Sequence, residues 1–292
     1  ASFLGGFFDM KKTALYLYIK FLGLGLNLLS FAFPKKATKI AYGLFSEPRA
    51  GKLNNEQLPE ILQQAQSEKI SYEDSFFQTY TWKGNDTIIL LVHGWESNAS
   101  RWEKLLPFLK KSGSTIVAID APAHGLSSGK EFSIPQYAAF IHLAVQKFNP
   151  DYLIGHSIGG QTCLYYQSMY QNKAIKKMVI LGTPSDFTII LSNFIKLLRL
   201  NTTIAKNIEN HYLNHFKLDI HQFSSQLFAK KVDTKGFIAH DTLDPVVKIA
   251  EAKKIASTWK DAIFYETNGL GHSMHDNQLY HKVSDFLFEN ES

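Results

Sequence analysis

The sequence is almost without cysteine, because Cys163 is the only one among its 292 residues. No disulfide can form within the chain, which excludes the small secreted proteins that depend on a disulfide framework and suits a reducing compartment. We therefore expect a cytoplasmic protein, with membrane association left open by an apolar segment near the N-terminus. Cys163 is expected to be a small core residue rather than a nucleophile.

The chain also has little net charge, since 31 Lys or Arg and 26 Asp or Glu give a net charge of only +5. The lysines are scattered and no long basic run is present, so nucleic acid is not an expected partner. The hydrophobic fraction of 45% is typical of a folded globular protein and argues against disorder. A chain of this length can form one large α/β domain with an insertion.

One long apolar run is found, from Thr13 to Phe33, in which Thr13, Lys20 and Asn27 recur at every seventh position. On a helix these three side chains would form a thin polar stripe. A signal peptide, a membrane-spanning anchor and an ordinary core helix remain open, although Lys20 and Asn27 interrupt an apolar span. The pattern favours a helix that lies on a membrane surface or packs over the domain's own apolar entrance. A membrane surface is therefore an expected peripheral contact of residues 13–33.

Strand and helix patterns alternate from residue 86 onward. Short β-branched runs, typical of strands buried on both faces, occur at residues 86–92, 115–120, 152–154, 178–181, 236–239 and 263–266. Helical patterns occur at residues 100–110, 134–147, 160–170, 246–258 and 277–288. This alternation predicts an α/β fold with a mostly parallel sheet wrapped by helices, and ligand chemistry beyond the carboxyl ends of the strands.

Two segments depart from the alternation. Residues 76–82 are predicted to be an antiparallel edge strand, after a polar connection in which residues 58–67 are predicted to be helical. Residues 186–231 are too long for an ordinary loop and are predicted to form an inserted helical lid over the carboxyl edge of the sheet. The helical stretches of this lid are expected at residues 187–198, 203–216 and 220–228. The predicted organisation is an N-terminal segment at residues 1–75, a core at 76–185 and 232–292, and a cap at 186–231.

Gly155-His-Ser-Ile-Gly159 lies between a predicted strand and a predicted helix, which is the context of a nucleophile elbow. A serine at the tip of so tight a turn has a strained backbone, and Gly155 and Gly159 must lack side chains for the turn to close. The turn lifts the Ser157 Oγ out of the sheet and directs the Ile158 N–H toward a bound acyl oxygen. Ser157 is therefore the candidate nucleophile, and His156 is expected to brace the turn.

A serine nucleophile needs a base, and the base needs an acid that orients it. Asp244 follows a predicted strand and precedes Pro245, a residue suited to a first helical turn, so Asp244 could also be a helix cap. Asp244 is the candidate acid and Asp241 is its nearest rival. His272, on a glycine-bearing loop after the last predicted strand, is the candidate base, with His275 as the alternative.

Val92-His-Gly-Trp95 is expected to supply the second donor of an oxyanion hole, because it directly follows an early strand. Gly94 lets the backbone approach the substrate, and the N–H of Trp95 would donate together with that of Ile158. A serine, a histidine and two backbone donors need no metal or organic cofactor, so none is expected.

A further motif, Asp120-Ala-Pro-Ala-His-Gly-Leu-Ser127, directly follows a predicted strand. Asp120 and His124 are expected to hold the active-site loops in place. Neither lies where an acid or base for Ser157 is expected, so both receive structural roles.

Taken in chain order, these motifs resemble the α/β-hydrolase superfamily over residues 87–288, and most closely its serine esterases, lipases and C–C bond hydrolases with a helical cap. The resemblance implies that Ser157 is the nucleophile, His272 the base and Asp244 the acid. The family often has glycine where this chain has Ala123, a departure that affects no candidate catalytic residue. Haloalkane dehalogenases and epoxide hydrolases of this fold carry aspartate at the elbow, so the serine argues against those activities.

The expected activity is hydrolysis of small to medium acyl or aryl esters, with a small-molecule ester as the substrate and an acyl-enzyme as the intermediate. A thioesterase, a lysophospholipase or a C–C bond hydrolase would use the same triad. A non-catalytic binding module of the same fold is the alternative outside enzymes. Such proteins usually lose one member of the triad, whereas all three positions are filled here.

Overall fold

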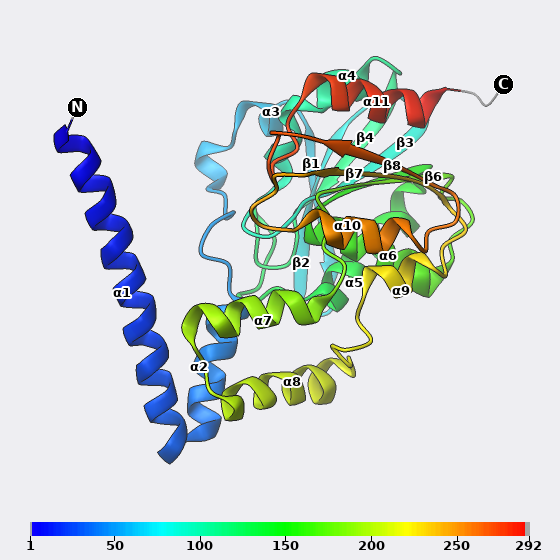
Figure 1. Cartoon of the computed structure of the whole chain (residues 1–292). Coiled ribbons are helices and arrows are strands. Elements are labelled where there is room, and N and C mark those ends of the chain that lie inside the picture. Colours follow the sequence, from blue (N-terminus) through cyan, green and yellow to red (C-terminus); the bar gives the residue numbers. More distant parts are fainter. Residues whose placement is uncertain (1, 290–292) are drawn as a thin grey trace. The chain divides into compact units, whose positions relative to one another are not determined.

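The computed structural model describes residues 2–289, with side chains from residue 14 onward. Residue 1 of the predicted N-terminal segment and residues 290–292 of the predicted core lie outside the described residues. The chain forms two compact units (Figure 1). The helical unit comprises the residues up to Ser46 together with Asp186–Phe223, and the sheet unit comprises Glu47–Ser185 and the residues from Ser224 onward.

The sheet unit is built on an eight-stranded sheet with the order β1-β2-β4-β3-β5-β6-β7-β8. Its strands are β1 (Gln66–Tyr72), β2 (Ser75–Trp82), β3 (Asn85–Val92), β4 (Ser114–Ile119), β5 (Tyr152–His156), β6 (Lys177–Leu181), β7 (Lys235–Asp241) and β8 (Ala262–Thr267). β1 pairs antiparallel with β2 and β2 with β4, whereas β3 to β8 pair in parallel. The predicted mostly parallel α/β sheet is confirmed.

Helices cover both faces of this sheet. They are η1 (Asn55–Gln57), α3 (Glu60–Gln63), η2 (Ala99–Lys104), α4 (Leu106–Lys110), α5 (Ile134–Phe148), α6 (Ile158–Tyr170), α9 (Ser225–Ala229), α10 (Ile249–Ala256) and α11 (Asn277–Phe288). On one face Leu109 of α4 and Val283 of α11 share a core with Ile89 and Leu91 of β3. α6 contacts β3, and Leu90, whose side chain points to the other face, is buried as well. Burial on both faces explains the unbroken apolar run in β3.

The start of the sheet differs from the prediction. Residues 58–67 were predicted to be helical, but only α3 is helix there, and residues 66–72 form β1. β2, predicted to be the edge strand, is therefore covered by β1 on its outer side. β1 is exposed along most of its length, so it carries no apolar alternation and only its pairing with β2 makes it a strand.

The helical unit consists of α1 (Ser2–Ala32), α2 (Pro34–Ser46), α7 (Phe187–Leu198) and α8 (Thr202–Phe216). Aromatic rings fill its interior, where Phe45 of α2 contacts Phe187 and Phe194 of α7 and Tyr212 of α8. The predicted helix at residues 13–33 thus forms the C-terminal part of α1. Residues 47–75, which the sequence assigned to the N-terminal segment, belong to the sheet unit.

α7 and α8 lie between β6 and β7 in the chain, as expected of an insertion. The third helical stretch expected at residues 220–228 is reduced to α9, which belongs to the sheet unit. That the insertion forms a lid over the carboxyl edge of the sheet stays a prediction.

Candidate active site

Ser157 stands at the turn between β5 and α6 with φ of +55° and ψ of −126°. Side chains at the neighbouring glycines would prevent this turn. A Cβ at Gly155 would lie 2.5 Å from the Gly160 Cα, and a Cβ at Gly159 would lie 2.3 Å from the Val92 carbonyl oxygen. The backbone conformation and the tight packing are those predicted for a nucleophile elbow.

Three side chains from separate loops meet at this turn. The Ser157 Oγ lies 2.9 Å from the His272 Nε2, and the His272 Nδ1 lies 2.7 Å from the Asp244 Oδ2. A carboxylate can only accept, so the Nδ1–H donates to Asp244 and leaves Nε2 free to accept from the serine hydroxyl. The structure therefore brings together the three candidate residues in the order that proton transfer requires.

The Asp244 carboxylate is buried but well supplied with donors. Its Oδ1 accepts from the N–H groups of Val246, at 2.7 Å, and Val247, at 3.0 Å, so it also caps the turn as the sequence allowed. Burial raises the pKa of Asp244, but the hydrogen bonds from His272, Val247 and Val246 outweigh burial and lower the pKa below its usual value. Asp244 is therefore ionised at neutral pH.

None of the described hydrogen bonds of Asp241, the rival acid, reaches His272, and three of them hold the strand end and loop that precede it. Its carboxylate accepts from the Thr267 hydroxyl at 2.9 Å and from the Leu270 N–H at 2.9 Å. A further bond to the Gly269 N–H measures 3.3 Å. His275, the rival base, bonds the Tyr280 hydroxyl.

His156, in the elbow, bonds the loop that carries the candidate base. Its Nε2 donates to the His272 carbonyl oxygen at 2.8 Å, which fixes the backbone of the His272 loop against the turn. Burial, and then the positive charge of Arg101, lower the pKa of His156 well below its usual value. The ring is therefore neutral, with Nδ1 as the unprotonated nitrogen.

The Val92–Trp95 turn lies directly against the elbow. A Cβ at Gly94 would come within 2.9 Å of the Ser157 Cβ, so glycine is needed for this close approach. Within the described part of the chain, the N–H groups of Trp95 and Ile158 donate no hydrogen bond. Two donors beside Ser157 are thus available to a ligand oxygen.

The Asp120–Ser127 motif, here called the second motif, is hydrogen-bonded to this turn. The His93 Nδ1–H donates to the Gly94 carbonyl oxygen at 2.7 Å, and its Nε2 accepts from the Ala121 N–H at 2.9 Å. Asp120 accepts from the Ala99 N–H and from the Tyr80 hydroxyl, and burial raises the pKa of this carboxyl to about 6. These contacts agree with the loop-holding role expected of Asp120.

The comparison with known families decides the class of this fold. A family model described as the alpha/beta hydrolase fold matches residues 87–230, which include the elbow, the strand-His-Gly turn and the second motif. The chain belongs to the α/β-hydrolase superfamily.

Two curated human proteins are similar to part of this chain. The chain is 32% identical over 102 residues to serine hydrolase-like protein and, over the same length, 32% identical to serine hydrolase-like protein 2. Each alignment covers 33% of this chain, and they cover 49% and 32% of the two relatives. The chain thus spans about half the length of one relative and a third of the other.

Solved structures show the same fold. An esterase from Rhodococcus superposes with a TM-score of 0.59 at 16% sequence identity, covering 77% of this chain and 98% of the esterase. At this identity the likeness establishes the α/β-hydrolase fold and leaves the substrate open.

One charged residue beside the candidate site, Arg101, could not be predicted from the sequence. Arg101, within the predicted helix at residues 100–110, donates from Nη2 to the Ser273 carbonyl oxygen at 3.0 Å, one residue beyond the candidate base. Burial lowers the pKa of this guanidinium to about 10. Arg101 lies in a helical pattern that gives no indication of this contact. The contact depends on the packing of η2 against the His272 loop.

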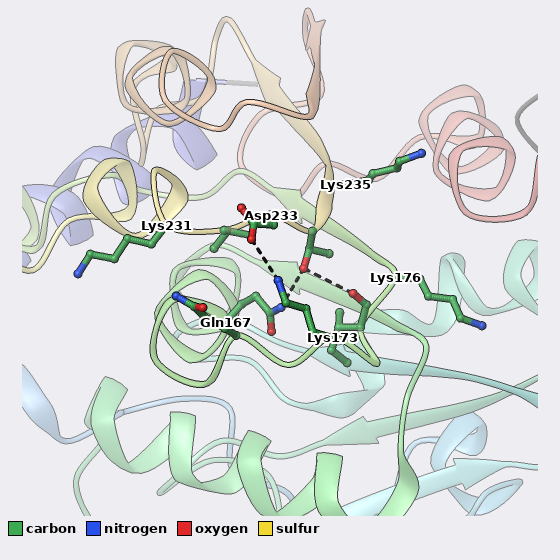
Figure 2. A pocket seen from close by; sticks show the side chains of 10 residues that line it. Gln167, Lys173, Lys176, Lys231, Asp233 and Lys235 are labelled. Carbon is green, nitrogen blue, oxygen red and sulfur yellow. Dashed lines mark hydrogen bonds and ion pairs between the residues drawn. The ribbon is translucent and has the colours of Figure 1, made fainter.

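A pocket of about 250 Å³ lies at the opposite end of the strands from Ser157 (Figure 2). Lys173, Lys231, Asp233 and Lys235 line it near the amino ends of β6 and β7, and Lys173 pairs with Asp233 at 3.1 Å. The pocket is therefore separate from the α/β-hydrolase site. The described residues include no group of three or more His, Cys, Asp or Glu side chains suited to a metal ion.

Proposed function

We propose that this chain hydrolyses carboxylic esters, of small to medium acyl or aryl groups, through an acyl-enzyme on Ser157. The observation that supports this is the continuous hydrogen-bond path from the Ser157 Oγ through both ring nitrogens of His272 to Asp244, at 2.9 Å and 2.7 Å. The human relatives, described as serine hydrolase-like, agree with a hydrolase that uses serine.

In the proposed reaction His272 Nε2 takes the hydroxyl proton as the Ser157 Oγ attacks the ester carbonyl carbon. The carbonyl oxygen becomes an oxyanion, which the N–H groups of Trp95 and Ile158 stabilise. The ester bond then breaks as His272 returns the proton to the leaving alcohol. Asp244 stabilises the transient imidazolium throughout.

The second half of the proposed reaction repeats these steps with water. His272 removes a proton from water, the resulting hydroxide attacks the acyl carbon, and the Ser157–acyl bond breaks as the proton returns to the Ser157 Oγ. The acid product leaves and the triad is restored. No other group has to supply or accept an electron or a proton.

Intact-mass analysis after treatment with a fluorophosphonate tests the proposal, because this probe phosphonylates activated serines. We expect one adduct on the wild type and on Ser67→Ala, a control for an exposed serine, and none on Ser157→Ala or His272→Ala. An unlabelled but folded wild type would favour a binding module. An adduct retained on Ser157→Ala would contradict the nucleophile.

The bond cleaved is tested with matched aryl esters and thioesters of increasing acyl length. We expect a burst of alcohol product from the esters, equal in amount to Ser157, followed by slower turnover. A higher kcat/KM for the thioester at every acyl length would show that thioesters, not esters, are the substrate class. It would not affect the assignment of Ser157 as the nucleophile.

A further inference from the structure

The helical unit has many exposed apolar side chains that its own helices leave uncovered. Of the nineteen large hydrophobic residues that are exposed in the described part of the chain, thirteen lie in this unit. Along α1 five of them recur at alternating intervals of four and three residues and so share one helix face: Leu17, Phe21, Leu24, Leu28 and Phe31. These side chains, here named the apolar stripe, are 49% to 83% exposed. Contiguous apolar surface of this kind marks an interaction site.

Contacts with α7 and with the α7–α8 turn show which side of α1 is packed within the unit. An added Cβ at Gly23 would lie 1.7 Å from the Leu198 carbonyl oxygen, so α1 touches the end of α7 there. The Asn27 side chain donates to the Arg199 carbonyl oxygen and accepts from the Asn201 N–H, both at 2.8 Å. Leu26 is also buried, at 4% exposure, so Gly23, Leu26 and Asn27 mark the packed side of α1, and the exposed apolar stripe lies outside it.

The first described side chains of α1 are exposed on every side. Residues 14–18 are each exposed, and Figure 1 shows this end of α1 extending beyond the other three helices of its unit. The sequence there, Ala-Leu-Tyr-Leu-Tyr, is apolar or aromatic throughout. Packing within the unit therefore does not explain why the helix is apolar at this end.

Positive charge is concentrated in the same unit. The residues up to Ser46 and Asp186–Phe223 carry ten Lys or Arg and four Asp or Glu, a net charge of +6. The rest of the chain carries 21 Lys or Arg and 22 Asp or Glu, a net charge of −1. Lys35, Lys36 and Lys39 follow the apolar stripe directly and are exposed. The exposed apolar and basic residues thus lie together.

We propose that this surface binds an anionic lipid membrane, with the apolar stripe among the outer acyl chains and Lys35, Lys36 and Lys39 at the headgroups. The stripe's spacing would also suit a helix of a second copy. Two copies, however, would bring like charges together, whereas anionic lipid complements both features.

The contacts of α1 favour a helix that lies on the membrane rather than one that crosses it. Residues 14–32 are long and apolar enough to span a bilayer, with a mean hydropathy of 1.5. A spanning α1 would carry the α7–α8 turn, with Arg199 and its polar backbone, into the hydrocarbon. The proposal concerns the helical unit alone and does not depend on the proposed function.

Flotation of the full chain with lipid vesicles tests the proposal. We expect the protein to float with vesicles of equal parts phosphatidylcholine and phosphatidylglycerol, and only weakly with phosphatidylcholine alone. Alkaline carbonate should release the bound protein, because no segment crosses the bilayer. Retention after carbonate treatment would overturn the surface-lying arrangement, and equal binding to both vesicles would overturn the requirement for anionic lipid.

Two pairs of variants separate the apolar and basic contributions. Phe21→Ser/Leu28→Ser should abolish flotation, whereas Met169→Ser/Ile263→Ser, which removes exposed apolar side chains from the sheet unit, should not. All four side chains are exposed, so circular dichroism should show unchanged folding. Equal flotation of the two variants would overturn the role of the apolar stripe.

Lys35→Glu/Lys36→Glu should weaken binding to the anionic vesicles by roughly 25-fold or more, since each lysine near such a surface contributes about fivefold. Lys130→Glu/Lys260→Glu changes the net charge equally in the sheet unit and should have little effect. A stable dimer that becomes monomeric in Phe21→Ser/Leu28→Ser, without vesicle binding by the wild type, would show that a second copy covers the surface instead.

Discussion

Asp241 and Asp244 lie three residues apart, yet they hold different parts of the site. Asp244 bonds the His272 ring, whereas Asp241 bonds Thr267 and Leu270 in the strand end and loop that precede His272. The first sets the tautomer of the candidate base, and the second sets the path of its backbone. Substitution of Asp244 should therefore affect mainly the reaction rate, and substitution of Asp241 mainly the stability.

We expect Asp244→Asn to lower kcat for an aryl ester by roughly 10³- to 10⁴-fold, because an amide no longer enforces the Nδ1–H tautomer of His272. Asp241→Asn should lower kcat by only about tenfold but reduce stability by about 1–3 kcal/mol, because part of a buried hydrogen-bond set is lost. Steady-state kinetics and urea unfolding of both variants check this. Equal kinetic losses would show that Asp241 shares the role of the acid.

His124 predicts a pH dependence of stability. Its Nε2 accepts from the Glu96 N–H at 3.0 Å and so must be unprotonated, and burial lowers its pKa from 6.5 to about 4. Above pH 6.5 His124 is neutral in both states. Between pH 6.5 and 4 the unfolded chain gains a proton that the folded chain lacks, so stability is lost as pH falls.

His124→Gln should flatten this decline by up to roughly 3 kcal/mol between pH 6.5 and 4, because the amide does not titrate. Urea unfolding at several pH values measures the change. His221→Gln, at an exposed histidine, is the control and should keep the wild-type slope. An unchanged slope in His124→Gln would mean that His124 is protonated in the folded protein.

Two glycines in α1 lie in different surroundings, so replacing each by alanine distinguishes the effect of helix packing from that of helix propensity. A Cβ at Gly23 would lie 1.7 Å from the Leu198 carbonyl oxygen, whereas a Cβ at Gly25 would have no neighbour within 4 Å. Gly23→Ala should therefore destabilise the helical unit by about 1–3 kcal/mol, because backbone must move. Gly25→Ala should stabilise it by roughly 0.5–1 kcal/mol.

Hydrogen exchange in the full chain measures both effects. Protection in α1 and at the α7–α8 turn should fall in Gly23→Ala and rise slightly in Gly25→Ala, while β3 to β7 stay unchanged. Stabilisation by both substitutions would show that α1 does not pack on α7.

The whole molecule should unfold in two steps, because each unit has its own core. All four tryptophans, Trp82, Trp95, Trp102 and Trp259, lie in the sheet unit, whereas helices occur in both units. In urea we expect far-ultraviolet circular dichroism to change before tryptophan fluorescence, since the smaller helical unit has less core. Gly23→Ala should widen the gap, and coincident transitions in both proteins would contradict independent units.

Much of the sheet could be predicted because buried parallel strands carry their signal locally. The run of β3 and the amphipathic pattern of α11 each depend on a few neighbouring residues. β1 could not be predicted, since its residues are polar and exposed and only pairing with β2 orders them. Arg101 was missed for a similar reason, because its partner Ser273 is distant in the sequence.

The sequence by itself determined the elbow around Ser157, the order of the candidate residues along the chain and the class of the fold. Those features depend on short motifs in which glycine and strand patterns leave few conformations. Only the tertiary structure decided that Asp244 and not Asp241 meets His272, and that α1 packs on α7 and α8 with its apolar stripe outward. Such choices depend on contacts between residues far apart in the chain, which local patterns do not encode.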